Sequence, residues 1–99
     1  MPHLAGRYCH TYNRGCSRER IFVADDTYLY LLKQVKRFLP GSSVSIIAYR
    51  LMPNHYHFLF GSETDDAVGR FIQRLFNTYT QAFNRRLGRS GTLFEGRFD

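Results

Sequence analysis

Three stretches of the chain show the apolar patterns of β-strands. The first, residues 7–13, alternates aromatic and smaller side chains and ends at an Asn-Arg-Gly turn signal. The second, residues 44–52, is rich in β-branched and aromatic residues. A Pro-Asn turn leads directly from it into the third, residues 55–60, so the pattern predicts that these two strands form an antiparallel hairpin.

Apolar residues at three- and four-residue steps predict a helix between the first two strands. Asp25 and Asp26 are its candidate N-caps, and the Pro40-Gly41 pair ends it. Its apolar stripe comprises Tyr28, Leu31, Leu32, Val35, Phe38 and Leu39.

The same spacing predicts a second helix after the third strand. Thr64, Asp65 and Asp66 offer caps at its start, and we expect it to end near Leu87 with Gly88 just beyond. Its apolar stripe comprises Val68, Phe71, Ile72, Leu75, Tyr79 and Phe83.

The short segment 92–98 reads as extended, which completes the element order β-α-β-β-α-β. This order is the ferredoxin-like arrangement, an α+β fold with two helices on one face of an antiparallel sheet. Because 99 residues suffice for one modest core, we expect residues 1–99 to form a single domain.

The third predicted strand carries two histidines on one face. Alternate side chains of a strand share a face, so His55 and His57 lie on the same side. The rings on the opposite side are those of Tyr56, Phe58 and Phe60. We expect the aromatic side to pack under the helices, which leaves the histidines on the open face as paired ligands for one divalent metal ion. A His-x-His pair alone is more often a polar strand face, and this alternative stays open on the spacing alone.

The charge of the chain is positive and uneven. Its net charge is +6, and residues 67–98 hold six arginines against the single acid Glu95. Arginine suits bidentate contact with phosphate and stacking on bases, so the pattern favours a nucleic-acid partner over a solvated helix face. These arginines are Arg70, Arg74, Arg85, Arg86, Arg89 and Arg97.

Composition narrows the class of protein further. An apolar fraction of 43% with 16% aromatic residues is typical of a folded globule. No apolar run is long enough to cross a bilayer, and the N-terminus lacks the layout of a signal peptide, so we expect a cytoplasmic protein without a membrane partner. Cys9 and Cys16 fit that compartment as free thiols, and their spacing matches no familiar zinc pattern.

Three separated motifs resemble one known family. They are Tyr8-x-x-x-Tyr-Asn-Arg-Gly15, Met52-Pro-Asn-His-Tyr-His57, and Phe83-Asn-Arg-Arg through Gly91-Thr-Leu-Phe-Glu-Gly-Arg-Phe98. In this order they resemble the single-tyrosine HUH transposases of the IS200-like type, and most of all the REP-associated tyrosine transposases. The resemblance implies a ferredoxin-like palm, a single-stranded or hairpin DNA partner, and Mg²⁺ or Mn²⁺ held by two histidines, here His55 and His57. It also implies a tyrosine that attacks the scissile phosphate and forms a 5′-phosphotyrosine.

The nucleophile is the main departure from this family. Family members carry it on a further helix downstream of the Gly-Arg-Phe element, whereas this sequence stops at Asp99, so we expect a C-terminally truncated domain whose catalytic residue is unknown. Tyr79 is a weak substitute because it falls on the apolar stripe between Leu75 and Phe83. Tyr8 and Tyr12 are less excluded, since both would lie on the open face.

The candidate DNA contacts follow from the same motifs and from the arginine-rich end. They are Asn13, Arg14, Arg74, Asn84, Arg85, Arg86, Arg89 and Arg97. Two alternatives stay open: a non-catalytic ferredoxin-like module that stacks bases on Tyr8 and Tyr12 without metal, and a decayed remnant with an unpaired sheet edge. A homodimer is also left open.

Overall fold

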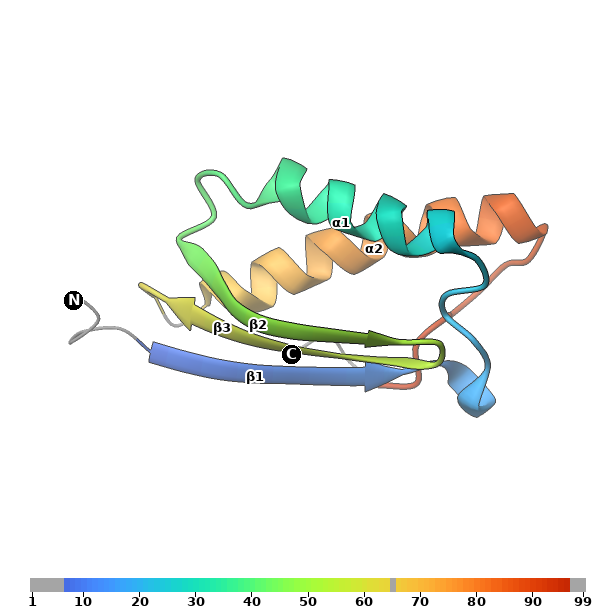
Figure 1. Cartoon of the computed structure of the whole chain (residues 1–99), viewed down its shortest axis with the longest axis horizontal. Coiled ribbons are helices and arrows are strands. Elements are labelled where there is room, and N and C mark those ends of the chain that lie inside the picture. Colours follow the sequence, from blue (N-terminus) through green and yellow to red (C-terminus); the bar gives the residue numbers. More distant parts are fainter. Residues whose placement is uncertain (1–6, 65, 97–99) are drawn as a thin grey trace.

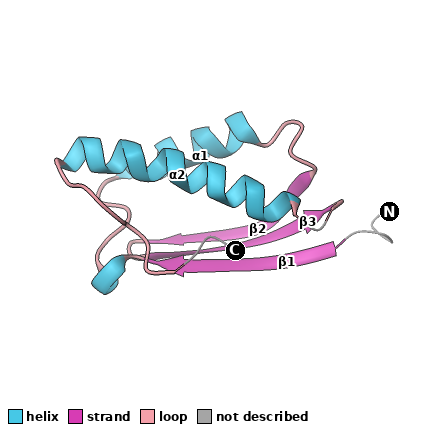
Figure 2. Cartoon of the chain, turned by 180° about the vertical axis from the view of Figure 1, so that it is seen from behind, coloured by secondary structure: helices cyan, strands magenta, loops and turns pink. Residues whose placement is uncertain are grey.

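The computed structural model describes residues 7–64 and 66–96, in which two helices lie on one face of a sheet (Figure 1). The view from behind shows the same two layers (Figure 2). The predicted α+β class is confirmed. The elements are β1 (Arg7–Arg14), the 3-10 turn η2 (Cys16–Arg18), α1 (Asp25–Phe38), β2 (Val44–Met52), β3 (His55–Ser62) and α2 (Ala67–Leu87).

The sheet has the strand order β1-β3-β2, and both pairings are antiparallel. The predicted hairpin is confirmed, since Met52 pairs with His55 across a two-residue turn. β3 is therefore the central strand, and β1 brings Arg14 opposite His55 from the other side. A register shift between Ile46 and Ala48 bends β2 near its start.

The described part of the chain contains one bridge of the final predicted strand. Gly15 and Phe94 form an isolated antiparallel bridge, and the amide of Cys16 donates to the carbonyl of Leu93 at 2.9 Å. The described residues thus follow the ferredoxin-like order through α2, and within them the last strand is represented by this bridge. Arg97 and Phe98, which the sequence places in that strand, lie outside the described residues.

The helix ends agree with the predicted ends more closely than the helix starts do. α1 stops at Phe38, and α2 is followed by Gly88 in the left-handed conformation, with φ 62°. At the start of α1, Ala24 is the N-cap, and the Thr27 hydroxyl accepts from the amide of Val23 at 3.2 Å. Asp25 and Asp26 therefore occupy the first turn, where their charges favour the positive end of the helix dipole, and the prediction that they cap it is wrong.

The second helix starts beside a similar group of polar residues. Asp66 is the N-cap of α2 and makes no side-chain capping bond, although the Thr64 hydroxyl lies 3.4 Å from its carboxylate. Asp65, the third candidate cap, lies outside the described residues. Within 7–64 and 66–96, no helix is both long and apolar enough to cross a membrane.

Aromatic packing between β3 and α2 forms the centre of the core. The rings of Tyr56 and Phe76 stack with centroids 4.2 Å apart, and Phe60 meets Phe71 edge-on at 5.6 Å. Every residue of the predicted α2 stripe is buried, as is Phe76, which the stripe did not include. The aromatic side of β3 is thus covered by helices, as its alternation predicts.

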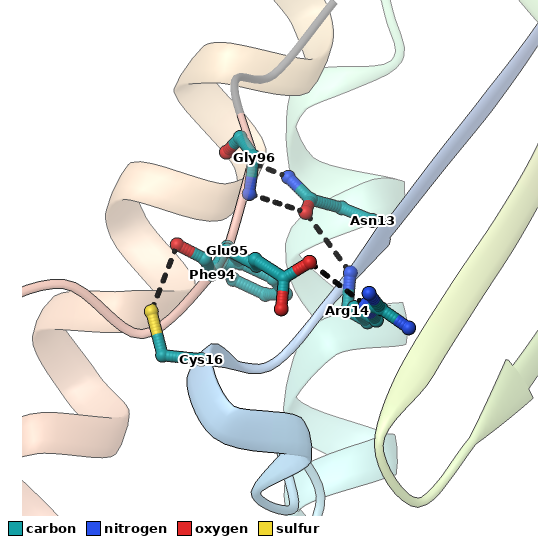
Figure 3. Close-up of polar contacts among 6 residues, drawn as sticks. All are labelled: Asn13, Arg14, Cys16, Phe94, Glu95 and Gly96. Carbon is teal, nitrogen blue, oxygen red and sulfur yellow. Dashed lines mark hydrogen bonds and ion pairs between the residues drawn. The ribbon is translucent and has the colours of Figure 1, made fainter.

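A polar clamp ties the end of β1 to the segment that follows α2 (Figure 3). The Asn13 amide group donates to the carbonyl of Gly96 at 3.0 Å, and its oxygen accepts from the Gly96 amide at 2.9 Å. Beside it, the Arg14 guanidinium donates to the Glu95 carboxylate at 2.9 Å, and the Glu95 amide donates to the Arg14 carbonyl at 2.7 Å. These contacts join positions about eighty residues apart and hold the C-terminal segment against the sheet.

We predict opposite effects of alanine at two glycines. A Cβ at Gly15 would lie 2.2 Å from the backbone oxygen of Glu19, so Gly15→Ala must displace the η2 turn and should lower the free energy of unfolding by about 1–3 kcal/mol. A Cβ at Gly69, inside α2, meets no atom within 4 Å, so Gly69→Ala should raise it by roughly 0.5–1 kcal/mol. Urea unfolding followed by circular dichroism measures both, and equal stability of the two variants would contradict the prediction.

Candidate metal centre and nucleic-acid interface

The two histidines lie on the open face of the central strand. Tyr56 and Phe58 are fully buried on the helix side, whereas His55 and His57 are half-buried on the other side. The two imidazoles meet edge to face with centroids 5.2 Å apart. The placement predicted from strand alternation is confirmed, and both rings are accessible from solvent.

His57 is surrounded by side chains from both neighbouring strands. Tyr12 is its direct partner on β1, with ring centroids 4.7 Å apart, and Arg50 is its partner on β2. His10, also on β1, stacks on His57 with centroids 5.2 Å apart and places its Nε2 3.1 Å from Nδ1 of His57. The predicted pair is therefore part of a larger polar and aromatic cluster.

Arg50 and His10 belong to this cluster although neither was predicted as a site residue. Arg50 could have been found from the two-residue hairpin turn, because pairing of Met52 with His55 sets Arg50 opposite His57. His10 required knowledge that β1 pairs with β3, a long-range contact that local patterns do not specify.

The hairpin turn that carries His55 is anchored by the loop after β1. The amide of Gly15 donates to the Asn54 carbonyl at 3.0 Å, and the amide of Ile21 donates to the Pro53 carbonyl at 2.7 Å. The Asn54 side-chain oxygen in turn lies 2.9 Å from Nδ1 of His55. The start of β3, and with it the ring of His55, is therefore fixed from outside the hairpin.

The surroundings of His57 favour its neutral ring over the protonated one. Desolvation is the largest cause that lowers the pKa of His57, and charge on His55, His10 and Arg50 lowers it further. A lowered pKa means that the folded state resists protonation as the pH falls through the ordinary histidine range. The neutral imidazole is also the form that binds metal ions.

The described residues supply only part of a metal coordination shell. Within them, no three or more His, Cys, Asp or Glu side chains are grouped so that they could hold a metal ion. His55 and His57 fit as two neutral nitrogen ligands on an open face, and the other positions would fall to water or substrate oxygens. Without a carboxylate, this donor set is a weak protein cage for Mg²⁺.

The arginine-rich end of α2 lies across the sheet from the histidines. The α2 C-terminus is at the same end of the molecule as the β2–β3 turn, but in the helix layer (Figure 1). Arg86 pairs with Asp26 of α1, and Arg89 donates to the side-chain oxygen of Asn84 and to the carbonyl of Thr92. Arg85 is exposed, and no hydrogen bond of its side chain is found among the described residues.

The other predicted DNA contacts are dispersed. Asn13 is buried in the clamp. Arg14 forms an ion pair with Glu95, and the hydrogen bond between them raises the pKa of Arg14. Arg74 lies over the ring of Phe38 at 4.4 Å, at the end of α1, whereas Arg86 pairs with Asp26 in the first turn of α1. Arg97 lies outside the described residues.

Tyr79 is a core residue on the helix side of the sheet. Its side chain is 1% exposed, and its hydroxyl donates to the carbonyl of Ile21. Burial is the main cause that raises the pKa of Tyr79, which disfavours the phenolate that a nucleophile needs. Tyr8 and Tyr12, by contrast, are 64% and 47% exposed on β1.

We predict that the Tyr79 hydroxyl contributes to stability. Tyr79→Phe leaves the Ile21 carbonyl without this donor and should lower the free energy of unfolding by about 1–3 kcal/mol. Tyr8→Phe removes a hydroxyl from an exposed side chain and should change it by no more than about 0.5 kcal/mol. Thermal or urea unfolding compares the two, and an unchanged stability of Tyr79→Phe would contradict the prediction.

Comparison with known proteins agrees with this arrangement of motifs. A family model described as IS200-like transposases matches residues 5–98, which include the histidine strand and both helices. A search of curated proteins finds no match. Members of this family are transposases that act on DNA and are generally metal-dependent. Because the match covers nearly the whole sequence, the chain belongs to the IS200-like transposase family.

Proposed function

We propose that the domain binds single-stranded or hairpin DNA across the open face of the sheet and supports metal-assisted cleavage and strand transfer there. One observation carries this proposal: His55 and His57 lie together on the open face of β3, with Arg14 and Arg50 as their cross-strand neighbours. Paired imidazoles beside guanidinium groups suit a phosphodiester, which offers oxygen ligands and negative charge together.

The protein side chains have distinct roles in this proposal. His55 and His57 would hold Mg²⁺ or Mn²⁺ through neutral imidazole nitrogens. When bound, such an ion polarises a phosphoryl oxygen and orients the scissile group. Arg50 would contact a phosphate next to His57, because it is exposed and lies opposite that residue on β2.

The nucleophile is not assigned. In the family that the motifs resemble, a tyrosine attacks phosphorus and the 3′-oxygen leaves. Among the described tyrosines, Tyr12 contacts both histidine rings, with centroids 5.8 Å from His55 and 4.7 Å from His57. Tyr79 is on the buried side of the sheet and is not proposed for this role.

A second candidate function is a nucleic-acid-binding module without chemistry. The exposed rings of Tyr8 and Tyr12 on β1 favour it, because unpaired bases stack on such rings without any need for metal. Metal titration in the presence of DNA distinguishes the two, since only the first function couples DNA binding to the ion.

We predict a Mn²⁺ site that depends on both histidines. The double variant His55→Ala/His57→Ala should lose Mn²⁺ binding in calorimetry, because these two imidazoles are the proposed ligands on this face. Circular dichroism should show that the variant remains folded, since both rings are outside the core. Unchanged Mn²⁺ binding by the folded double variant would exclude this site.

We also predict that the arginines at the end of α2 strengthen DNA binding through their charge. Each phosphate that the protein neutralises adds about 0.7 to the slope of log affinity against log salt for single strands. Arg85→Ala/Arg86→Ala should therefore flatten that slope by roughly one unit or more, as measured by DNA titrations at several salt concentrations.

Two matched variants locate the surface that the DNA contacts. Arg70→Ala removes one positive charge near the start of α2, where Arg70 pairs with Asp66, and should leave the slope nearly unchanged. Arg50→Ala removes a charge from the histidine face and should flatten the slope by the amount expected for about one phosphate. If only Arg50→Ala has an effect, the DNA binds the sheet face and not the end of α2.

A further inference from the structure

We propose that His10 is a positioning residue that orients the ring of His57 and fixes its tautomer, so that Nε2 of His57 is free to bind the ion shared with His55. This inference deepens the proposed function and rests on it. Its basis is a hydrogen-bonded pair of histidines from neighbouring strands, His10 on β1 and His57 on β3.

The sheet register sets His10 beside His57. His10 pairs with Leu59 and Tyr12 pairs with His57, so His10 is the diagonal neighbour of His57 on the same face. The two rings stack at an interplanar angle of 29°, and the Nε2 of His10 lies 3.1 Å from Nδ1 of His57. That distance is within hydrogen-bond range, so one nitrogen must donate and the other accept.

His55 also has a hydrogen-bond partner at its Nδ1 atom. Its Nδ1 lies 2.9 Å from the side-chain oxygen of Asn54, which can only accept. With the Asn54 amide in this orientation, the contact is a hydrogen bond when Nδ1 of His55 donates, and Nε2 of His55 then keeps its lone pair. Histidines that bind metals commonly donate their other N–H to such a partner, which fixes the tautomer and the orientation of the ring.

His10 acts on His57 as Asn54 acts on His55. When Nε2 of His10 accepts, Nδ1 of His57 carries the proton and both ligand rings present a free Nε2. When the bond runs the other way, Nε2 of His57 is protonated and has no lone pair for an ion. Tyr12, which lies directly opposite His57, packs against it with centroids 4.7 Å apart. The His57 ring thus contacts two rings of β1, those of Tyr12 and of the diagonal neighbour His10, and has little freedom to turn.

Two substitutions at His10 separate the hydrogen bond from the ring stacking. His10→Phe keeps an aromatic ring and removes the acceptor nitrogen, whereas His10→Gln supplies an amide oxygen that can accept from His57. Tyr8→Phe is the matched control, because Tyr8 lies two residues earlier on the same face of β1 and is 64% exposed. All three substitutions are outside the core, so each variant should fold.

The first measurement is made on the metal-free protein. Long-range ¹H–¹⁵N spectra at about pH 8, where histidines are neutral, report which ring nitrogen carries the proton. We expect His57 to be protonated at Nδ1 in the original sequence, in His10→Gln and in Tyr8→Phe. In His10→Phe we expect a shift of His57 towards the Nε2-protonated form. A role limited to packing would leave this signature unchanged.

The second measurement is Mn²⁺ affinity by calorimetry. His10→Phe should bind Mn²⁺ about tenfold more weakly, at the lower end of the effect of residues that orient metal ligands, because this hydrogen bond is exposed. His10→Gln and Tyr8→Phe should bind nearly as tightly as the original sequence.

Three results would overturn the role of His10. The first is a His57 ring protonated at Nε2 in the original sequence, and the second is an unchanged His57 tautomer in His10→Phe. The third is a change in the ¹⁵N chemical shift of a His10 ring nitrogen when Zn²⁺ is added, which would mark His10 as a ligand. The proposed function fails separately, if the original sequence binds no Mn²⁺, and the tautomer spectra still decide the role of His10 in that case.

Discussion

The stacking of Tyr56 on Phe76 determines which side of the central strand faces the helices. With centroids 4.2 Å apart and both side chains at most 1% exposed, this pair joins β3 to α2 at the middle of the core. A shift of β3 by one residue would bury the histidines and expose the aromatic rings, at a large cost in buried apolar area. The open position of His55 and His57 is thus a consequence of core packing.

Charge in this domain is divided between its two layers. In the helix layer, Arg86 is held by Asp26, whose pKa is lowered chiefly by that hydrogen bond. On the sheet face, Arg50 lies opposite His57 and contributes to the lowered pKa of that ring. Among the described residues, arginine charge is therefore present in both layers, and the C-terminal end of α2 lies at the same end of the molecule as the β2–β3 turn.

Local patterns predicted the elements well and the contacts between distant elements poorly. The stripe of α2 and the alternation of β3 are repeated signals over many residues, and both are confirmed by burial. The pairing of β1 with β3 has no comparable local signal, so the neighbours His10 and Tyr12 of His57 could not be derived. For the same reason the sequence predicts Asn13 as a turn residue or a DNA contact. In the structure its side chain makes hydrogen bonds with the backbone of Gly96, a residue far away in the chain.

The clamp between Asn13 and Gly96 also has a dynamic consequence for the histidine strand. Arg14 and Gly15 follow Asn13 directly, and the Gly15 amide holds the carbonyl of Asn54 in the turn before His55. Opening the clamp would release the end of β1, and with it a support of that turn. Amide hydrogens of these three segments would then exchange with solvent as one cooperative unit, although they are far apart in the chain. The geometry of the histidine pair is in this sense sensitive to the last residues that pack against the sheet.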